Sequence, residues 1–246
     1  MKLKSVFFFI LLFVPLKFAA FPACDYSSAR SPEIPVSDLP DVDLTDIKNI
    51  PDLYFECQIA HMAENAVIPV FYNPLVREYI EIYLMGRKKQ IPELSMLSVK
   101  YFPLFEDRLK NANLPEELKY IPVIESGLNP LALSPSGAFG LWQFKAETGR
   151  AFGLVVDEAS DERSDPEKST QAACDYLNYL NTIFGNWQLS LLAYHAGPTT
   201  VKNAIIKAGG KTSFNEIAGF LPLATQRYLP AYIAVMYVLN NYKNHI

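Results

Sequence analysis

The sequence predicts an all-α protein with one helical domain over residues 53–246. From Leu53 onward, apolar residues recur at spacings of three and four, the periodicity of helices that bury one face. No run of alternating apolar and polar residues competes with this pattern as a strand. Of the 246 residues, 50% are apolar and 20% are charged, so the chain is long and apolar enough to bury a globular core.

Residues 1–23 have the pattern of a signal peptide. Lys2 and Lys4 supply positive charge, and residues 5–16 then form an uncharged, mostly apolar run. This run is about half of the roughly 20 residues that a bilayer-spanning helix needs, so a leader is favoured over a permanent anchor. We therefore expect an exported protein that resides in the periplasm.

The cysteines leave two questions open. Cys24 follows Ala23 as the acylated cysteine of a bacterial lipoprotein follows its small residue, although the two residues before Ala23 depart from that pattern. Membrane attachment through a lipidated Cys24 and simple cleavage nearby are both compatible with the sequence. In an oxidising compartment, Cys57 and Cys174 would either form a disulfide or be two buried free thiols.

Residues 24–52 predict an extended, proline-rich tether, because four prolines lie among serines and aspartates with little helical periodicity. The helices of the domain follow. Asn73 and Pro74 provide a cap and a first-turn proline for one helix, and Ser164, Asp165 and Pro166 open another. Further helices are expected at about 92–110, 114–126, 143–151, 165–184, 187–196, 198–208 and 222–243.

Glu125 occupies a position that suits proton transfer. Pro115 and Gly127 suit the start and the stop of a helix, so Glu125 would lie at its carboxyl end. The negative end of the helix dipole and the apolar neighbours of Glu125 both disfavour a charged carboxylate, as a general acid requires. Pro122, one turn earlier, predicts a kink that aims the carboxyl. Most glutamates near helix ends are only solvated, so this feature alone identifies no site.

A glycine-rich segment follows Glu125. Five of the eleven glycines lie between residues 127 and 153, and such grouping permits tight turns and close approach of the backbone to a ligand. Ser134, Trp142 and Gln143 add a hydroxyl, an aromatic ring and an amide, which are groups that bind sugars. A tight turn between helices, with Trp142 in the core, explains the same residues equally well.

Composition and spacing argue against several kinds of partner. A formal net charge of −4 disfavours nucleic acid, which is bound mainly by neutralising phosphates. His61, His195 and His245 are scattered without the spacing of metal ligands, so we expect no metal and no other cofactor. We expect a monomer.

Several motifs occur together in a distinctive order. They are Glu125-Ser126, Gly140-Leu141-Trp142-Gln143, Ala193-Tyr194-His195-Ala196-Gly197 and the segment 221–230. In order and approximate spacing they resemble the lytic transglycosylase domain of goose-type lysozyme-like enzymes, in particular the membrane-bound lytic transglycosylase D group. The likeness covers most of residues 70–235, with the catalytic core at about 108–235.

The resemblance implies a lysozyme-like (goose-type) helical fold. It also implies cleavage of the β-1,4 bond between N-acetylmuramic acid and N-acetylglucosamine in peptidoglycan glycan strands, with 1,6-anhydro ends. Glu125 would be the only catalytic acid and base, because the acetamido group and the C6 hydroxyl of the substrate replace a second protein carboxylate. Substrate contacts are implied for Ser134, Gln143, Tyr194 and Tyr228.

Two positions depart from the pattern of the family. His195 stands where the family usually has Asn, so a titratable ring joins the substrate-binding set. Ala224 stands where the family normally has Glu. Two other functions stay open: a non-catalytic peptidoglycan-binding protein, and a lysozyme-type hydrolase whose base comes from an acidic run. That run would otherwise serve in capping and ion pairing, and its members are Asp157, Glu158, Asp161 and Glu162.

Overall fold

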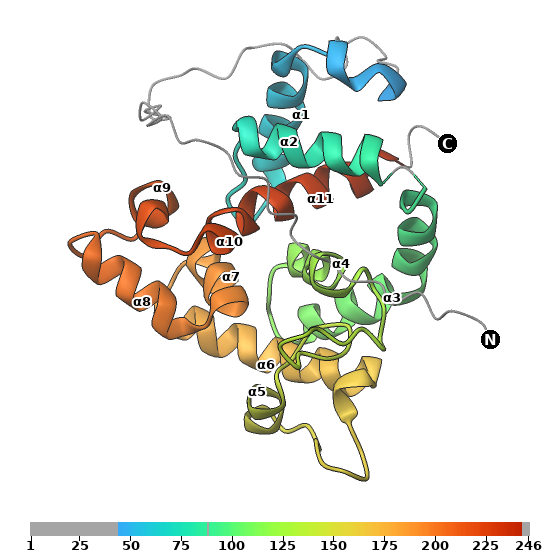
Figure 1. Cartoon of the computed structure of the whole chain (residues 1–246), viewed down its shortest axis with the longest axis vertical. Helices are drawn as coiled ribbons and strands as arrows, with labels where there is room; N and C mark the ends of the chain where they lie inside the picture. The colour runs from blue at the N-terminus through green and yellow to red at the C-terminus, as the bar shows by residue number, and fades with distance from the viewer. Residues whose placement is uncertain (1–43, 88, 243–246) are drawn as a thin grey trace.

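The computed structural model describes residues 44–87 and 89–242, and these residues form helices joined by loops (Figure 1). Within the described residues there is no strand, only isolated β-bridges. The predicted all-α class is therefore confirmed. The α-helices are α1 (Asp52–Asn65), α2 (Pro74–Glu81), α3 (Ile91–Asn111), α4 (Ile121–Ser126), α5 (Ala146–Ala151), α6 (Pro166–Phe184), α7 (Trp187–Ala196), α8 (Pro198–Lys207), α9 (Phe214–Ile217), α10 (Leu223–Gln226) and α11 (Tyr228–Tyr242).

Short helical turns lie before and between the α-helices. They are the 3₁₀ helices η2 (Leu44–Asn49), η4 (Glu116–Tyr120), η5 (Glu162–Ser164) and η6 (Ala218–Phe220), and the π-helical turn η3 (Ile82–Gly86). The expected leader, Cys24 and His245 lie outside the described residues. No helix in the described part of the chain combines the length and the apolar character that crossing a membrane requires.

Helix α11 is the centre of the fold. Every residue from 228 to 239 is buried, and a helix that is apolar on all sides must be enclosed by other helices. α2 packs along α11, and α4 and α7 also contact it (Figure 1). α11 therefore joins the amino-terminal helices to the helices that carry the predicted site.

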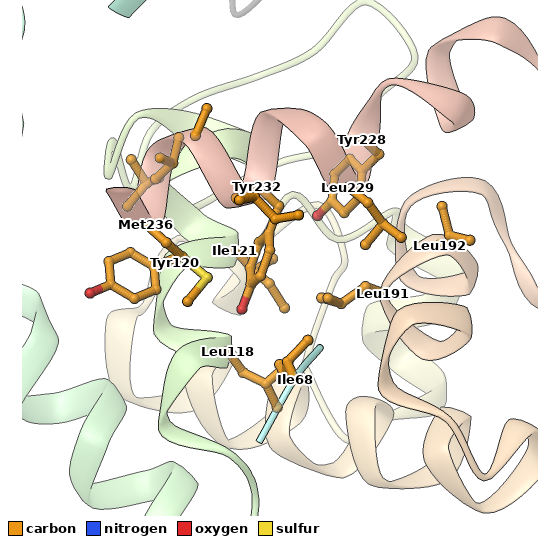
Figure 2. Packing of buried hydrophobic residues seen from close by; sticks show 14 of the residues in the cluster. Ile68, Leu118, Tyr120, Ile121, Leu191, Leu192, Tyr228, Leu229, Tyr232 and Met236 are labelled. Carbon is orange, nitrogen blue, oxygen red and sulfur yellow. The ribbon is translucent and has the colours of Figure 1, made fainter. Parts of the chain in front are cut away.

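The core around α11 fixes the place of α4. Figure 2 shows Tyr228, Leu229 and Tyr232 of α11 among apolar side chains of η4, α4 and α7. The buried Tyr232 hydroxyl donates a hydrogen bond of 2.7 Å to the Glu117 carbonyl in η4. Each buried leucine or isoleucine in such a cluster stabilises the fold by about 1.5–3 kcal/mol. The position of α4 relative to α7 and α11 thus depends on the core and not on a flexible loop.

The predicted helix over 114–126 forms as two pieces. Residues 116–120 make the 3₁₀ helix η4, and α4 begins at Ile121 with Pro122 in its first turn. A proline in the first turn removes no intrahelical hydrogen bond. Pro122 therefore lies in the first turn of α4 and not inside a longer helix, so the predicted kink at Pro122 is wrong.

Two other predicted helices are shorter than expected. The helix expected over 143–151 begins only at Ala146, and the one expected over 222–243 is interrupted at Arg227 between α10 and α11.

The described end of the expected tether packs on the domain. Leu44–Asn49 forms η2, and Ile47 and Ile50 are buried in the core. The Arg77 guanidinium of α2 donates a hydrogen bond of 2.6 Å to the Ile47 carbonyl and lies over the Phe55 ring of α1. Residues 44–55 are thus fastened to α2.

The two described cysteines are free thiols. Cys57 in α1 and Cys174 in α6 are both buried and unpaired with each other. Of the two alternatives, the disulfide is therefore wrong and the pair of buried thiols is confirmed. Burial raises the pKa of the Cys174 thiol to about 12, which keeps it protonated and unreactive.

Candidate active site

The carboxyl of Glu125 lies in the last turn of α4. Gly127 ends the helix in the left-handed conformation (φ 60°), and its N–H donates to the Val123 carbonyl at 3.1 Å. The Leu128 N–H closes the same turn on the Pro122 carbonyl at 3.2 Å. The Glu125 side chain is 16% exposed. The helix end therefore holds one partly enclosed carboxyl that still reaches solvent.

Tyr228 of α11 holds one oxygen of this carboxyl. Its hydroxyl donates a hydrogen bond of 2.9 Å to Glu125 Oε1, and the residue is 1% exposed. Burial and the negative charge of Glu125 raise the pKa of Tyr228 well above its ordinary value, so the hydroxyl keeps its proton and remains a donor. Within the described residues Oε2 accepts no hydrogen bond, which leaves it as the oxygen available to a substrate.

His195 of α7 lies beside the same oxygen. Its Nδ1 is 3.9 Å from Glu125 Oε1, and its ring stacks on the Tyr228 ring with centroids 4.4 Å apart and an interplanar angle of 22°. Three helices distant in sequence, α4, α7 and α11, therefore bring Glu125, His195 and Tyr228 together.

Tyr194 links α7 to the glycine-rich segment. Its hydroxyl donates a hydrogen bond of 2.8 Å to the Trp142 carbonyl. Burial of this hydroxyl and the negative charge of Glu125 raise the pKa of Tyr194 well above its ordinary value. Tyr194 thus lies within the electrostatic reach of Glu125, with its proton directed at the backbone.

Trp142 is part of the core and no sugar-binding platform. It is fully buried, and its indole N–H donates to Thr170 Oγ1 of α6 at 2.9 Å. The Ser126 hydroxyl lies 2.9 Å from the Pro122 carbonyl and 2.8 Å from the Leu141 carbonyl. The segment around Trp142 is thereby attached to the helix end that carries Glu125.

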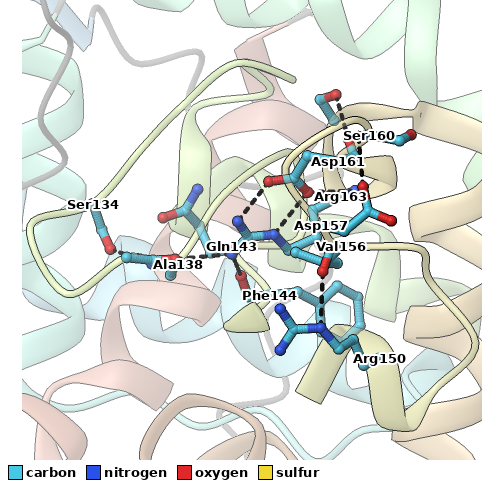
Figure 3. Close-up of polar contacts among 12 residues, drawn as sticks. Ser134, Ala138, Gln143, Phe144, Arg150, Val156, Asp157, Ser160, Asp161 and Arg163 are labelled. Carbon is cyan, nitrogen blue, oxygen red and sulfur yellow. Dashed lines mark hydrogen bonds and ion pairs between the residues drawn. The ribbon is translucent and has the colours of Figure 1, made fainter. Parts of the chain in front are cut away.

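Ser134 and Gln143 both make hydrogen bonds within the glycine-rich loop, and Figure 3 shows the bond between Ser134 and Ala138. The Gln143 amide donates to the carbonyls of Ala132 (2.9 Å) and Gly140 (2.8 Å), which leaves its Oε1 as the atom that can accept from a ligand. Ser134 Oγ accepts from the Ala138 N–H at 2.9 Å and lies 3.1 Å from Ser136 Oγ. The loop is therefore braced by the side chains predicted to bind substrate.

Arg163 is a positioning residue that sequence reasoning missed. The side chain is 7% exposed, and Nη1 donates to the carbonyls of Gly137 (2.9 Å) and Phe144 (3.0 Å). Nε and Nη2 donate to the Asp161 carboxylate at 2.9 and 2.6 Å (Figure 3). The bonds to the Gly137 and Phe144 carbonyls tie the glycine-rich loop to Arg163. In the sequence, Arg163 follows Asp161 by two residues. This spacing does not predict that the arginine is buried or that it bonds to the loop.

The acidic run serves in pairing and capping. Asp161 binds Arg163, and this hydrogen bonding holds the pKa of the Asp161 carboxyl below its usual value. Glu162 accepts from the Val155 N–H at 2.7 Å and from Lys168 Nζ at 2.6 Å. Asp157 accepts from the N–H groups of residues 159 and 160. Among the described contacts of Glu125 there is no second carboxylate.

Metal binding finds no support in the described part of the chain, where no group of three or more histidine, cysteine, aspartate or glutamate side chains is arranged to hold an ion.

Comparison with known proteins finds a similar domain family and several similar proteins. Residues 102–217 match the family model described as the transglycosylase SLT domain. Over 177 residues, 70% of the chain, the sequence is 34% identical to membrane-bound lytic murein transglycosylase D of Escherichia coli K12 and covers 38% of that protein. It is also 34% identical over 103 residues to peptidoglycan transglycosylase gp16 of Escherichia phage T7, covering 41% of this chain and 8% of that one.

Solved structures share the fold. The crystal structure of the 70 kDa soluble lytic transglycosylase of Escherichia coli matches 80% of this chain and 32% of its own, with a TM-score of 0.51 and 21% identity. The complex of the 70 kDa soluble lytic transglycosylase with bulgecin A matches 81% of this chain and 32% of its own, with a TM-score of 0.54 and 21% identity. This likeness confirms the expected lysozyme-like helical fold.

The matched span of residues 102–217 contains Glu125, Ser134, Gln143 and the Tyr194-His195 pair, and Tyr228 follows just beyond it. The chain spans about two fifths of the length of the Escherichia coli relative. Family match, sequence identity and fold agree, and residues 102–217 of the chain are therefore similar to the transglycosylase SLT domain.

Proposed function

We propose that the chain is a peptidoglycan lytic transglycosylase. It would cleave the β-1,4 bond between N-acetylmuramic acid and N-acetylglucosamine and leave 1,6-anhydro ends. The observation that carries this proposal is the Glu125 carboxyl at the end of α4, with Oε1 held by Tyr228 and Oε2 without a hydrogen bond among the described residues. The relatives named lytic murein transglycosylase and peptidoglycan transglycosylase support the choice of substrate.

In the proposed reaction Glu125 performs both proton transfers. As a carboxylic acid it protonates the leaving glycosidic oxygen, and as a carboxylate it then takes the proton of the C6 hydroxyl that attacks the anomeric carbon. The acetamido group of the substrate stabilises that carbon between the two steps. Ordinary glycosidases place a second carboxylate roughly 5–9.5 Å from the first. The described hydrogen-bond and ion-pair contacts of Glu125 are with Tyr228 and His195.

The substrate would be held by hydrogen bonds at the mouth of the site. We assign contacts with sugar hydroxyls and acetamido groups to the Ser134 hydroxyl, the Gln143 Oε1, the Tyr194 hydroxyl and the His195 ring. Tyr228 would keep the Glu125 carboxyl aimed. A chain of net charge −4 that acts on an anionic polymer must rely on such directed contacts, because bulk charge attraction does not favour the complex.

The proposed location is outside the cytoplasm. The basic start and the apolar run over residues 5–16 support a leader at 1–23. The prolines support a tether over 24–52, whose end from residue 44 packs on the domain at 53–246. Membrane attachment would use a lipid on Cys24. The mass of the mature chain tests this step, since acylation adds the mass of the lipid and simple cleavage adds none.

Product analysis tests the proposed chemistry. Purified chain is incubated with peptidoglycan in ¹⁸O-enriched water, and the released muropeptides are weighed by mass spectrometry. We expect anhydro ends, lighter by one water than reducing ends and free of ¹⁸O. Reducing ends that carry ¹⁸O would instead identify a lysozyme-type hydrolase. Binding to peptidoglycan with no soluble product would identify a non-catalytic glycan-binding protein.

A further inference from the structure

We infer that Arg163 sets the affinity of the site for its sugar, because it fixes the direction in which the Gln143 side chain offers its oxygen. This inference rests on the proposed function, in which Gln143 Oε1 contacts the substrate. Arg163 itself is 7% exposed, and its guanidinium donates four hydrogen bonds within the protein. Its effect must therefore reach the sugar through the glycine-rich loop that it holds.

The direction of the Gln143 oxygen is decided by two backbone carbonyls. Gln143 Nε2 donates to the Ala132 carbonyl at 2.9 Å and to the Gly140 carbonyl at 2.8 Å. Since both protons of the amide are used, Oε1 points away from these carbonyls. An oxygen held in this way accepts from an N–H or O–H donor, such as the N–H of an acetamido group. A shift of the two carbonyls would turn the oxygen away from that donor.

The backbone at Gln143 needs support from outside the loop. Its φ is 50°, a left-handed conformation that costs free energy at a residue other than glycine. Such a conformation persists where the surrounding contacts over-determine it. The Gln143 N–H donates to the Gly140 carbonyl at 3.2 Å, and the Phe139 N–H donates to the Phe144 carbonyl at 3.0 Å. These bonds tie the loop to itself, so an anchor elsewhere must decide where its carbonyls lie.

Arg163 supplies this anchor. Its Nη1 donates to the carbonyl of Phe144, the residue after Gln143, and to the carbonyl of Gly137. The Arg163 carbonyl oxygen also lies against Gly140, where an added Cβ would be 1.8 Å away. Arg163 thus contacts the loop on both sides of Gln143 in sequence, at Gly140 and at Phe144.

Arg163 is itself held in place. Asp161 accepts from Nε at 2.9 Å and from Nη2 at 2.6 Å, the two-bond geometry that arginine forms with a carboxylate (Figure 3). The stem of Arg163 packs beside Gly149 of α5, where an added Cβ would lie 3.4 Å from Cγ. Because Asp161 neutralises the guanidinium, Arg163 offers little attraction to an anionic glycan. Its role is therefore to position the loop.

A double-mutant cycle tests the path from Arg163 through Gln143. We measure KM and kcat on soluble glycan fragments for the wild type, Arg163→Lys, Gln143→Ala and the double variant. Lysine keeps the positive charge but lacks the planar fork that binds two carbonyls and a carboxylate together. Arg150→Lys is the matched control, because Arg150 of α5 donates to the Val156 carbonyl, outside the loop.

We expect Arg163→Lys to raise KM about 3–10-fold, as the loss of one hydrogen bond to the sugar does, with kcat close to that of the wild type. The double variant should have the KM of Gln143→Ala alone, because the arginine acts through the glutamine. Arg150→Lys should keep the wild-type KM. Effects that multiply in the double variant would overturn the inference, and so would an unchanged KM in Arg163→Lys.

A second measurement needs no activity. In a ¹⁵N-labelled chain, the side-chain NH₂ signals of Gln143 report its two hydrogen bonds, and their loss in Gln143→Ala assigns them. We expect Arg163→Lys to move these signals toward the shifts of glutamines in water, whereas Arg150→Lys leaves them in place. Unchanged Gln143 signals in a folded Arg163→Lys chain would overturn the inference.

A milder variant covers the case in which Arg163→Lys does not fold. Asp161→Asn keeps the arginine and weakens its two bonds to the carboxylate, so we expect smaller changes in the same direction in both measurements. Wild-type KM and wild-type Gln143 signals in Asp161→Asn would then overturn the inference. A wild-type chain that releases no product from peptidoglycan would overturn the proposed function, while the NMR comparison would still decide whether Arg163 positions Gln143.

Discussion

At the scale of single residues, the orientation of the Glu125 carboxyl, the proposed acid and base, depends on one hydroxyl. Tyr228 donates to Glu125 Oε1 from the buried start of α11, so the carboxyl cannot rotate freely to present either oxygen. The ring of Tyr228 packs against the core and against the His195 ring, and its hydroxyl reaches Glu125. The two roles can therefore be separated by removing the oxygen alone.

We predict that Tyr228→Phe lowers kcat by roughly 10–100-fold, since a hydrogen bond to a charged group contributes about 1.5–3 kcal/mol. Steady-state rates on glycan fragments provide the measurement. The melting temperature, followed by circular dichroism, should change by only a few degrees because the ring stays packed. Wild-type kcat in a folded Tyr228→Phe chain would contradict the assigned role.

The sequence predicted which residues lie close to Glu125 more reliably than it predicted the hydrogen bonds of those residues. Glu125, Tyr194, His195 and Tyr228 lie within mutual influence, as the resemblance to the family implied. Sequence could not show that the Gln143 amide braces its own loop, because that depends on a backbone φ of 50° and on carbonyls several residues away. Residue type indicates which hydrogen bonds a side chain can make, and only the fold decides which are made.

At the scale of elements, the glycine-rich loop is held from one side by the chain around Arg163. A Cβ added at Gly140 would lie 1.8 Å from the Arg163 carbonyl oxygen, so the two backbones approach as closely as only glycine permits. Gly137 has a similar positive φ, 80° against 87°, but open space where its Cβ would be. An alanine at Gly137 would therefore add backbone strain alone, whereas an alanine at Gly140 would add the same strain and a steric clash.

We predict that Gly137→Ala costs roughly 1–2 kcal/mol of unfolding free energy, the cost of a left-handed alanine. Gly140→Ala should cost about 1–3 kcal/mol more, because the backbone must also move away from Arg163. Chemical denaturation measures both values. Equal losses for the two variants would show that the loop and the Arg163 segment do not pack as described.

The sequence predicted where helices begin better than it predicted whether a helix runs without interruption. Asn73 and Asp165 cap α2 and α6 with the side-chain hydrogen bonds that their positions predicted. The segment over 114–126 was predicted as one helix because its apolar spacing is continuous. Its division at Ile121 puts Pro122 in the first turn of α4, and both pieces pack against α11, a contact across more than 100 residues that no local pattern contains.

At the scale of the whole molecule, stability comes from packing around α11 and not from a covalent link. Cys57 and Cys174 lie in different helices and are free. A disulfide between them would close a loop on the order of 100 residues and contribute roughly 4–5 kcal/mol. Such a link would raise the melting temperature by roughly 10 °C in a domain of this size.

We predict that a reducing agent changes the melting temperature of the full chain by less than about 1 °C. Calorimetry with and without the reductant makes the comparison, and a Cys57→Ser variant measured under oxidising conditions serves as the control for a covalent link. A fall of several degrees on reduction would contradict the free thiols.

The central claim is that Glu125 alone transfers the protons of cleavage, and the rate of muropeptide release by Glu125→Gln tests it most directly. Gln keeps the size of the side chain and cannot give or take the proton, and Glu158→Gln in the exposed acidic run is the matched control. We predict that Glu125→Gln, folded as judged by its melting temperature, loses at least about 1,000-fold in rate, because one residue supplies both acid and base, while Glu158→Gln retains the wild-type rate. Release by Glu125→Gln at near the wild-type rate would contradict the account.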